Sequence, residues 1–188
     1  MITLRDALLI LSLNLVMYTW SHAQIHYTHQ FTKKLKRTQL QFVEPVEGMY
    51  RIQMLRKDDF LKYDLVLASE DYQLDMRYIV EPKAGKMTPM HLTFLSRTST
   101  LALNDEHFDI KVHVYHPNLA NSLFHADWAA YADFIPKRSL TDKHFGRLLS
   151  IYKADCGVAS ILLLFNEHKG EEDRRMYSLS FSGAAVSD

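Results

Sequence analysis

Four histidines flank one stretch in which apolar and polar side chains alternate: His107, His113, His116 and His125, with Asp127 close behind. A zinc site needs three or four nitrogen, oxygen or sulfur ligands that converge on one point. On a strand, His113 and His116 are three positions apart and point to opposite faces, so they share an ion only if the strand ends between them. We favour surface or hydrogen-bonded histidines. A metal-dependent enzyme that uses His113, His116 and His125 is the alternative.

The candidate nucleophiles are weak. Cys156 is the only cysteine, so no disulfide can form within the chain, and its neighbours Ala-Asp-Cys-Gly are typical of a turn with an exposed thiol. A cysteine hydrolase would also need a nearby base such as His144 or His168. The sequence has no Gly-x-Ser-x-Gly motif and no glycine-rich phosphate loop. We expect an unreactive cysteine, no cofactor and a non-enzymatic protein.

An aspartate beside a tryptophan starts the strongest candidate for a binding site. Asp127 and Trp128, followed by Tyr131, Phe134 and the cation of Lys137, could line an aromatic pocket for a small ligand or a peptide. Large aromatic side chains are more often buried for packing. We therefore favour core positions for Trp128 and Phe134, with Asp127 in a cap or turn, over the pocket.

Residues 1–23 have the pattern of a secretory signal peptide. Arg5 lies in a short first region, residues 7–18 are nearly all apolar, and Ser21 and Ala23 are small residues at the expected cleavage positions. The apolar run is shorter than the roughly 20 residues that span a bilayer, so a membrane anchor is the less favoured interpretation. We expect cleavage near Ala23, a periplasmic or secreted protein, and no stable membrane insertion afterwards.

The charge balance is neutral, with 22 basic and 22 acidic residues. A neutral protein lacks the electrostatic footprint of a nucleic-acid or anionic-membrane binder. We therefore expect no nucleic acid partner. After the signal peptide we expect a lead-in over residues 24–39, loosely held or forming one short helix, and a single domain over residues 40–188.

The elements that must position these residues are mostly strands. Residues 63–82 predict a hairpin. Its second run has the alternation of a half-buried strand that Pro82 ends, with Tyr72, Leu74, Met76, Tyr78 and Val80 on one face and Gln73, Asp75, Arg77, Ile79 and Glu81 on the other. Residues 108–115 alternate in the same way. Residues 148–165 predict a second hairpin whose last strand is covered on both sides. Further strands are expected over 40–43, 49–55 and 177–181, and after His125.

Fewer helices are expected. Residues 89–103 predict an amphipathic helix with Leu92, Leu95, Ser99, Ala102 and Leu103 on its buried face. Residues 118–125 predict a helix or irregular segment, residues 139–144 a short helix, and residues 167–175 a charged loop. Strands outnumber helices, so the fold class is α+β, with a mainly antiparallel sheet of about six or seven strands packed with helices.

A spaced pattern of residues resembles a group of uncharacterised secreted bacterial proteins with the PsbP and DcrB type of α/β sandwich. The residues that carry it are Phe42, Pro45, Tyr63-Asp64, Leu74, Arg77-Tyr78, Pro82, Ala126-Asp127-Trp128, Phe134, Pro136-Lys137 and Gly157. The resemblance covers roughly residues 40–181 and contains no catalytic signature. It implies a binding or assembly factor by analogy only.

These observations lead to two hypotheses about function. The first is a non-enzymatic, soluble protein of the cell envelope that binds a partner protein or small ligand through the region of Trp128 or the exposed edge of the sheet. The second is a small periplasmic hydrolase or metal-dependent enzyme that uses the histidines around His113. The enzyme requires His113, His116 and His125 to lie within a few ångströms of one another, whereas the binding protein requires an open pocket or an exposed apolar patch near Trp128.

Overall fold

The computed structural model describes residues 28–44, 50–53, 61–69, 71, 73–83, 90–103 and 110–183. The predicted signal peptide and the start of the lead-in lie outside these residues. In the described part of the chain, no helix is long and apolar enough to cross a membrane.

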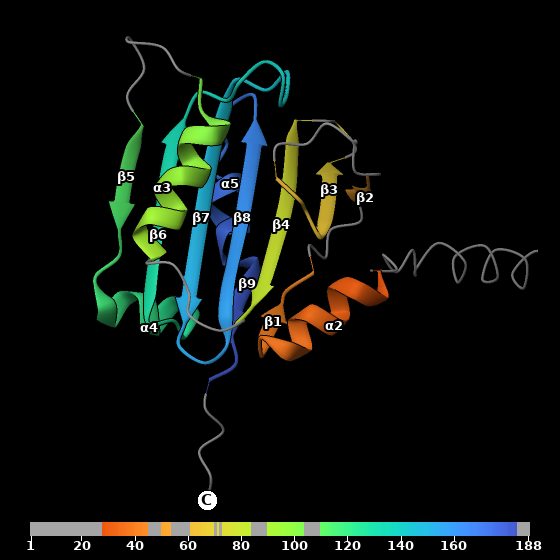
Figure 1. The fold of residues 1–188 in the computed structure, drawn as a ribbon. Helices are drawn as coiled ribbons and strands as arrows, with labels where there is room; N and C mark the ends of the chain where they lie inside the picture. Colours follow the sequence, from red (N-terminus) through yellow and green to blue (C-terminus); the bar gives the residue numbers. More distant parts are fainter. Residues whose placement is uncertain are drawn as a thin grey trace, which may run out of the picture.

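The core of the fold is a seven-stranded sheet in the order β2-β3-β4-β8-β7-β6-β5, and a two-stranded sheet pairs β1 with β9 (Figure 1). Every pairing is antiparallel. The strands are β1 Leu40–Phe42, β2 Tyr50–Ile52, β3 Leu65–Ser69, β4 Leu74–Pro82, β5 Lys111–Val114, β6 Trp128–Phe134, β7 Phe145–Lys153, β8 Gly157–Phe165 and β9 Leu179–Phe181. The helices are α2 His29–Arg37, α3 Met90–Leu101, α4 Pro117–Phe124, α5 Glu171–Arg175 and the 3-10 turn η1 Met176–Ser178. This confirms the predicted α+β class.

Both predicted hairpins are confirmed. β3 pairs with β4, and β7 pairs with β8 through a three-residue turn that includes Asp155, whose φ is 69°. Gly157 follows that turn with a φ of 132°, and a Cβ atom there would lie 2.2 Å from the Glu81 carbonyl oxygen. Only glycine fits this conformation and this close approach, so the turn residues determine where β8 begins.

The sheet has two covered faces, each with its own apolar core. α3 lies over one face, and α2, α4, α5 and the β1-β9 pair lie over the other (Figure 1). We call these the α3 face and the α5 face. Because β4 and β8 lie in the middle of the sheet, both are buried on both sides. This confirms the prediction for β8. For β4 the half-buried prediction was wrong, since Asp75 and Arg77 are buried as well.

Three further local predictions were wrong. α3 buries Phe94, Thr98 and Leu101, whereas Leu92 and Leu95 are 51% and 45% exposed. Residues 138–140 form a turn where a short helix was expected, and the expected charged loop contains α5. By contrast, the strand predicted within residues 108–115 is confirmed as β5, which is exposed on both sides because it is the last strand of the sheet.

The predicted short helix in the lead-in is α2, and it packs on the sheet. Thr28 caps its first turn by accepting a hydrogen bond from the Phe31 N–H, and the Phe31 ring is fully buried in the core of the α5 face. Lys34 Nζ lies 2.6 Å from Asp64 Oδ1, and Asp64 Oδ2 accepts a hydrogen bond from the Val80 N–H. One carboxylate thus joins α2 to β4.

Candidate functional site

The three histidines of the proposed metal site do not converge. His113 is on β5, with its ring stacked 4.6 Å from the Tyr131 ring. His116 and His125 are the caps at the two ends of α4, and eight helical residues separate them by roughly 12 Å. Within the described ranges, no group of three or more histidine, cysteine, aspartate or glutamate side chains is placed to hold a metal ion. His116 and His125 therefore occur on either side of residues 117–124 because they cap the two ends of α4.

Cys156 is buried, whereas its sequence context predicted exposure. It lies beyond the end of β7, and His144 precedes the start of that nine-residue strand. The length of the strand separates the two residues by roughly 30 Å. His168 follows β8 and so lies at the same far end of the sheet as His144. The thiol and the histidines that we considered as its partners therefore lie at opposite ends of the sheet.

The five residues of the predicted aromatic pocket are divided between the two faces of β6. Trp128 and Phe134 belong to the core of the α3 face, and the Trp128 ring packs edge-on against Phe94 with centroids 5.8 Å apart. Tyr131 points to the α5 face. Asp127 Oδ2 accepts a hydrogen bond from the Ala154 N–H, and Lys137 Nζ donates one to the Thr100 carbonyl. These five side chains do not line one pocket.

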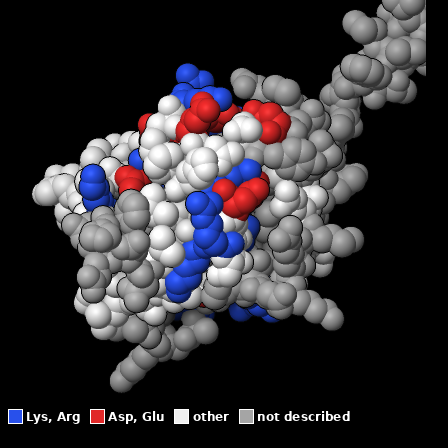
Figure 2. All heavy atoms as spheres, turned by 90° about the horizontal axis from the view of Figure 1, so that it is seen from above, with Lys and Arg blue, Asp and Glu red and all other residues white. Residues whose placement is uncertain are grey.

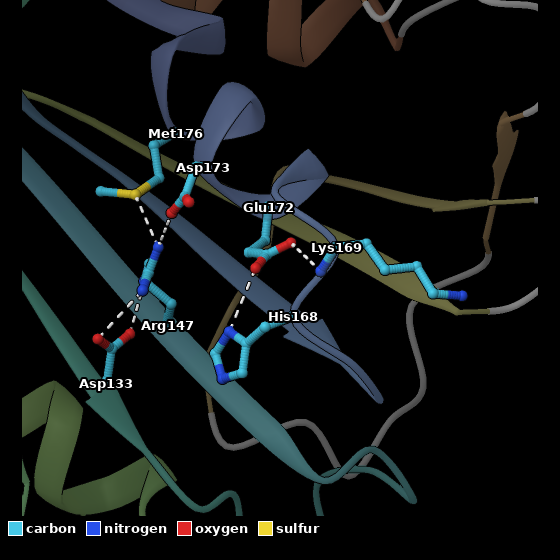
Figure 3. Close-up of polar contacts among 7 residues, drawn as sticks. All are labelled: Asp133, Arg147, His168, Lys169, Glu172, Asp173 and Met176. Carbon is cyan, nitrogen blue, oxygen red and sulfur yellow. Dashed lines mark hydrogen bonds and ion pairs between the residues drawn. The ribbon is translucent and has the colours of Figure 1, made fainter.

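A charged group that the sequence did not predict lies beneath α5 (Figure 3). Arg147 on β7 bonds Asp133 on β6 through two contacts, Nε to Oδ1 at 2.5 Å and Nη2 to Oδ2 at 3.1 Å. Its Nη1 bonds the Asp173 carboxylate on α5 and lies 3.6 Å from the Met176 sulfur. The guanidinium carbon also lies 5.2 Å from the centre of the Tyr131 ring. We call these five residues the Arg147 cluster.

Electrostatics keeps Arg147 charged. Burial alone would lower the pKa of its guanidinium, but hydrogen bonds and charge attraction from Asp133 and Asp173 outweigh that effect and raise the pKa. The side chain is only 12% exposed. A cation that is held by carboxylates from two different elements joins α5 to the sheet. The Arg147 cluster thus has a structural role, which is to hold α5 on the sheet.

A second carboxylate on α5 stabilises the loop before the helix. Glu172 is buried, and its Oε1 lies 3.2 Å from His168 Nδ1 while its Oε2 accepts a hydrogen bond from the Lys169 N–H (Figure 3). The His168 ring packs on Phe145 and Phe165 at 4.7 and 4.9 Å. These contacts use both carboxylate oxygens within the chain, so this pair also has a structural role.

A row of aromatic rings continues from Tyr131 toward α4. Tyr115 packs 5.7 Å from Tyr131 and 5.6 Å from Phe124, and Phe124 stacks on Tyr177 at 5.6 Å. Burial is the main cause that raises the pKa of the Tyr115 phenol to about 12. The row runs along the α5 face beside β6 and α4, and it leaves His113 of β5 exposed at its end.

The opposite face of β5 carries an apolar surface. Val112 and Val114 are 40% and 63% exposed, and they pair with Ala132 and Ala130 of β6, so they lie on the α3 face. Trp128 is partly exposed on the same face of β6. Leu95 of α3 is exposed as well and lies on the side of the helix nearer to β5. We call Leu95, Val112, Val114 and Trp128 the β5 edge surface.

Helix geometry places Leu95 on the side of α3 that is nearer to β5. Arg97 reaches from α3 to Ser160 on β8 and to Glu81 on β4, so that flank of the helix points to the middle of the sheet. Residues 95 and 97 are about 200° apart on a helix, and the buried Phe94 lies between the two directions. Leu95 therefore points toward β6 and β5.

The main chain of β5 is open on its outer side. The Tyr115 N–H donates to the Ala129 carbonyl, so in this register residues 111, 113 and 115 direct their main-chain groups toward β6. Val112 and Val114 direct theirs away from the sheet. β5 is the last strand in the order, and no other described strand pairs with its outer side. The apolar side chains and the outward main-chain groups thus belong to the same two residues.

Charges of both signs mix on the end of the molecule seen from above. Some basic side chains form a short central row with acidic groups beside it, and other groups of both signs lie nearer the rim (Figure 2). In contrast, Lys111 is the only charged residue of β5.

Among the described residues, the fold is a mainly antiparallel α+β domain whose sheet ends at β5 on one side and at β2 on the other. No family model, curated protein or solved structure matches the chain.

Proposed function

We propose that this chain is a non-enzymatic, soluble protein of the bacterial cell envelope that binds a protein partner through the β5 edge surface. The observation that carries the proposal is that Val112 and Val114 offer exposed apolar side chains together with outward main-chain groups. An exposed strand edge can accept a strand from another chain, with affinity from main-chain hydrogen bonds and specificity from alternate side chains.

The position of Trp128 favours a protein partner over a small ligand. Its ring packs on Phe94 and stays partly exposed, so it adds a flat apolar area beside β5. A small ligand would need a concave site that buries most of its surface. Trp128 and Tyr131 point to opposite faces of β6 and do not form one.

The envelope location and the resemblance to the PsbP and DcrB type of sandwich stay predictions from the sequence. The location depends on cleavage of residues 1–23, which mass spectrometry of the mature protein tests directly. A mature chain that begins near Gln24 would support it, and a chain that keeps its first residues would contradict it.

Site-specific photo-cross-linking tests the binding proposal. A benzoylphenylalanine residue replaces Val114 in one protein and Val43 in the control, because Val43 is 60% exposed and lies at the end of β1, outside the seven-stranded sheet. We expect one discrete adduct in cells from position 114 and none of that mass from position 43. Equal labelling at both positions, or none at 114, would overturn the proposal.

A further inference from the structure

We propose that the partner at this edge is a second copy of the same chain, joined by antiparallel pairing of the two β5 strands around a twofold axis through His113. The result is a continuous fourteen-stranded sheet, since each copy contributes seven strands. This inference rests on the proposed function, because it names the occupant of the same edge.

The main-chain groups fit such a pairing. In an antiparallel pair, directly opposed residues point to the same face, so Val112 of one copy lies opposite Val114 of the other, and His113 lies opposite its own copy. The outward groups of β5 are those of Val112 and Val114, on either side of His113. The two Val112–Val114 pairs therefore exchange four hydrogen bonds. His113 becomes a non-hydrogen-bonded pair, in which side chains approach most closely.

The side chains agree with the same axis. The α3 face of one copy continues into the α3 face of the other, so four exposed valines meet on one side of the joined strands. Cross-strand pairs of β-branched residues stabilise a sheet. Leu95 and Trp128 of each copy lie beside these valines on the same face and extend the apolar area. On the other face, the two exposed His113 rings meet, each stacked on its own Tyr131.

The charges are compatible with self-association. The chain has a formal net charge of zero, so two copies do not repel each other at long range. Lys111, the only charge on β5, lies opposite Tyr115 of the other copy. The two Lys111 residues are then offset by four strand positions, about 14 Å, which exceeds the screening length of about 8 Å at physiological salt. If Val112 were on the axis, the two lysines would be only two positions apart.

The small contact predicts a weak dimer. β5 has only four residues, and interfaces smaller than roughly 1,200 Å² are typically weak. We expect a dissociation constant on the order of micromolar. The dimer is then detected at high protein concentration or after covalent trapping.

Disulfide trapping tests the position of the axis. In a C156A background, H113C places one thiol on the axis, where Cα atoms of a non-hydrogen-bonded pair lie about 4.5 Å apart, within disulfide range. In V112C the two thiols are offset diagonally by about 7 to 8 Å, beyond that range. Because His113 and Val112 are both exposed, each variant keeps the core intact. V43C is the control, and its rate of disulfide formation measures random collisions between exposed thiols.

Under mild oxidation we expect a disulfide-linked dimer from H113C at least tenfold faster than from V112C or V43C. Equal rates for the three variants, or a dimer from V112C alone, would overturn the inference. The photo-cross-link at position 114 separates this inference from the proposed function. An adduct of twice the chain mass supports both, an adduct with another protein leaves only the proposed function standing, and no adduct removes both.

Discussion

The Arg147 cluster and the β5 edge surface lie on opposite faces of one sheet, and their polar groups are arranged in opposite ways. Arg147 donates hydrogen bonds to carboxylates on β6 and α5, so its partners belong to the same chain. Val112 and Val114 direct their main-chain groups away from the sheet, and their side chains stay exposed. The charged residues beneath α5 serve the fold, and the open apolar strand is the place where we propose that binding occurs.

The largest expected loss of stability follows from removing the cation of the Arg147 cluster. Arg147→Met leaves Asp133 and Asp173 facing each other without the charge that joins them. Loss of one partner of a fully buried pair costs about 3 to 5 kcal/mol, and because Asp133 and Asp173 are 32% and 63% exposed we expect a smaller loss, about 2 to 3 kcal/mol. Urea denaturation of the two proteins measures the free energy of unfolding.

The control for this change is Arg174→Met. Arg174 lies on the same short helix but is exposed. We expect it to change the free energy of unfolding by less than about 0.5 kcal/mol. If both variants lose the same stability, the Arg147 cluster does not have the role that we assign to it.

Trp128 tests the boundary between core and edge, since its ring contributes to both. Trp128→Ala removes the edge-on contact with Phe94, and because the ring is only partly buried we expect a loss of about 2 kcal/mol in the free energy of unfolding. Trp128→Phe keeps an aromatic ring and should lose less than half of that. A fully stable Trp128→Ala protein would mean that the residue serves binding alone.

The sequence was most informative where a local rule determines the structure. Both hairpins were predicted, because alternation and turn residues specify neighbouring antiparallel strands. It was less informative about which face is buried. Leu92 and Leu95 suggested the wrong face of α3, since the orientation of this helix depends on the reach of Arg97 to Ser160 and Glu81.

The β5 edge surface and the Arg147 cluster could not be predicted from the sequence either, because both depend on contacts between distant parts of the chain. An alternating stretch such as residues 108–115 has the same period at the edge and in the centre of a sheet, so the exposure of β5 follows only from the strand order. The Arg147 cluster joins residues that are 14 and 26 positions apart along the chain. No spacing rule connects them. The five-residue helix α5, which carries Asp173, was itself predicted as a loop.

A charge on the edge should separate binding from stability. Val114→Lys places an ammonium group among the four valines of the proposed dimer, so we expect at least tenfold weaker self-association in sedimentation equilibrium. Val43→Lys, at a position of matched exposure, should leave self-association unchanged. Both variants should unfold within about 0.5 kcal/mol of the parent protein, because both sites are exposed. Equal self-association of the two variants would contradict a role for the edge.

The smallest expected effect concerns Tyr115, which directly follows β5 and contacts Tyr131 of the Arg147 cluster and Phe124 of α4. Its pKa is raised to about 12 in the folded protein, mainly by burial, from an ordinary value of 10.0. As the pH rises from 10 to 12, the unfolded chain loses this phenol proton while the folded chain keeps it, so the free energy of unfolding falls. Tyr115→Phe should therefore flatten the loss between pH 9 and pH 11 by about 1 kcal/mol, a value discounted for the partial exposure of the ring. Tyr78, whose pKa burial raises to about 12, and Tyr50, whose pKa is also raised, remain in both proteins and contribute to the residual slope. An unchanged slope in Tyr115→Phe would show that Tyr115 ionises equally easily in the folded and unfolded chains, and that the aromatic row is more open to solvent than its packing indicates.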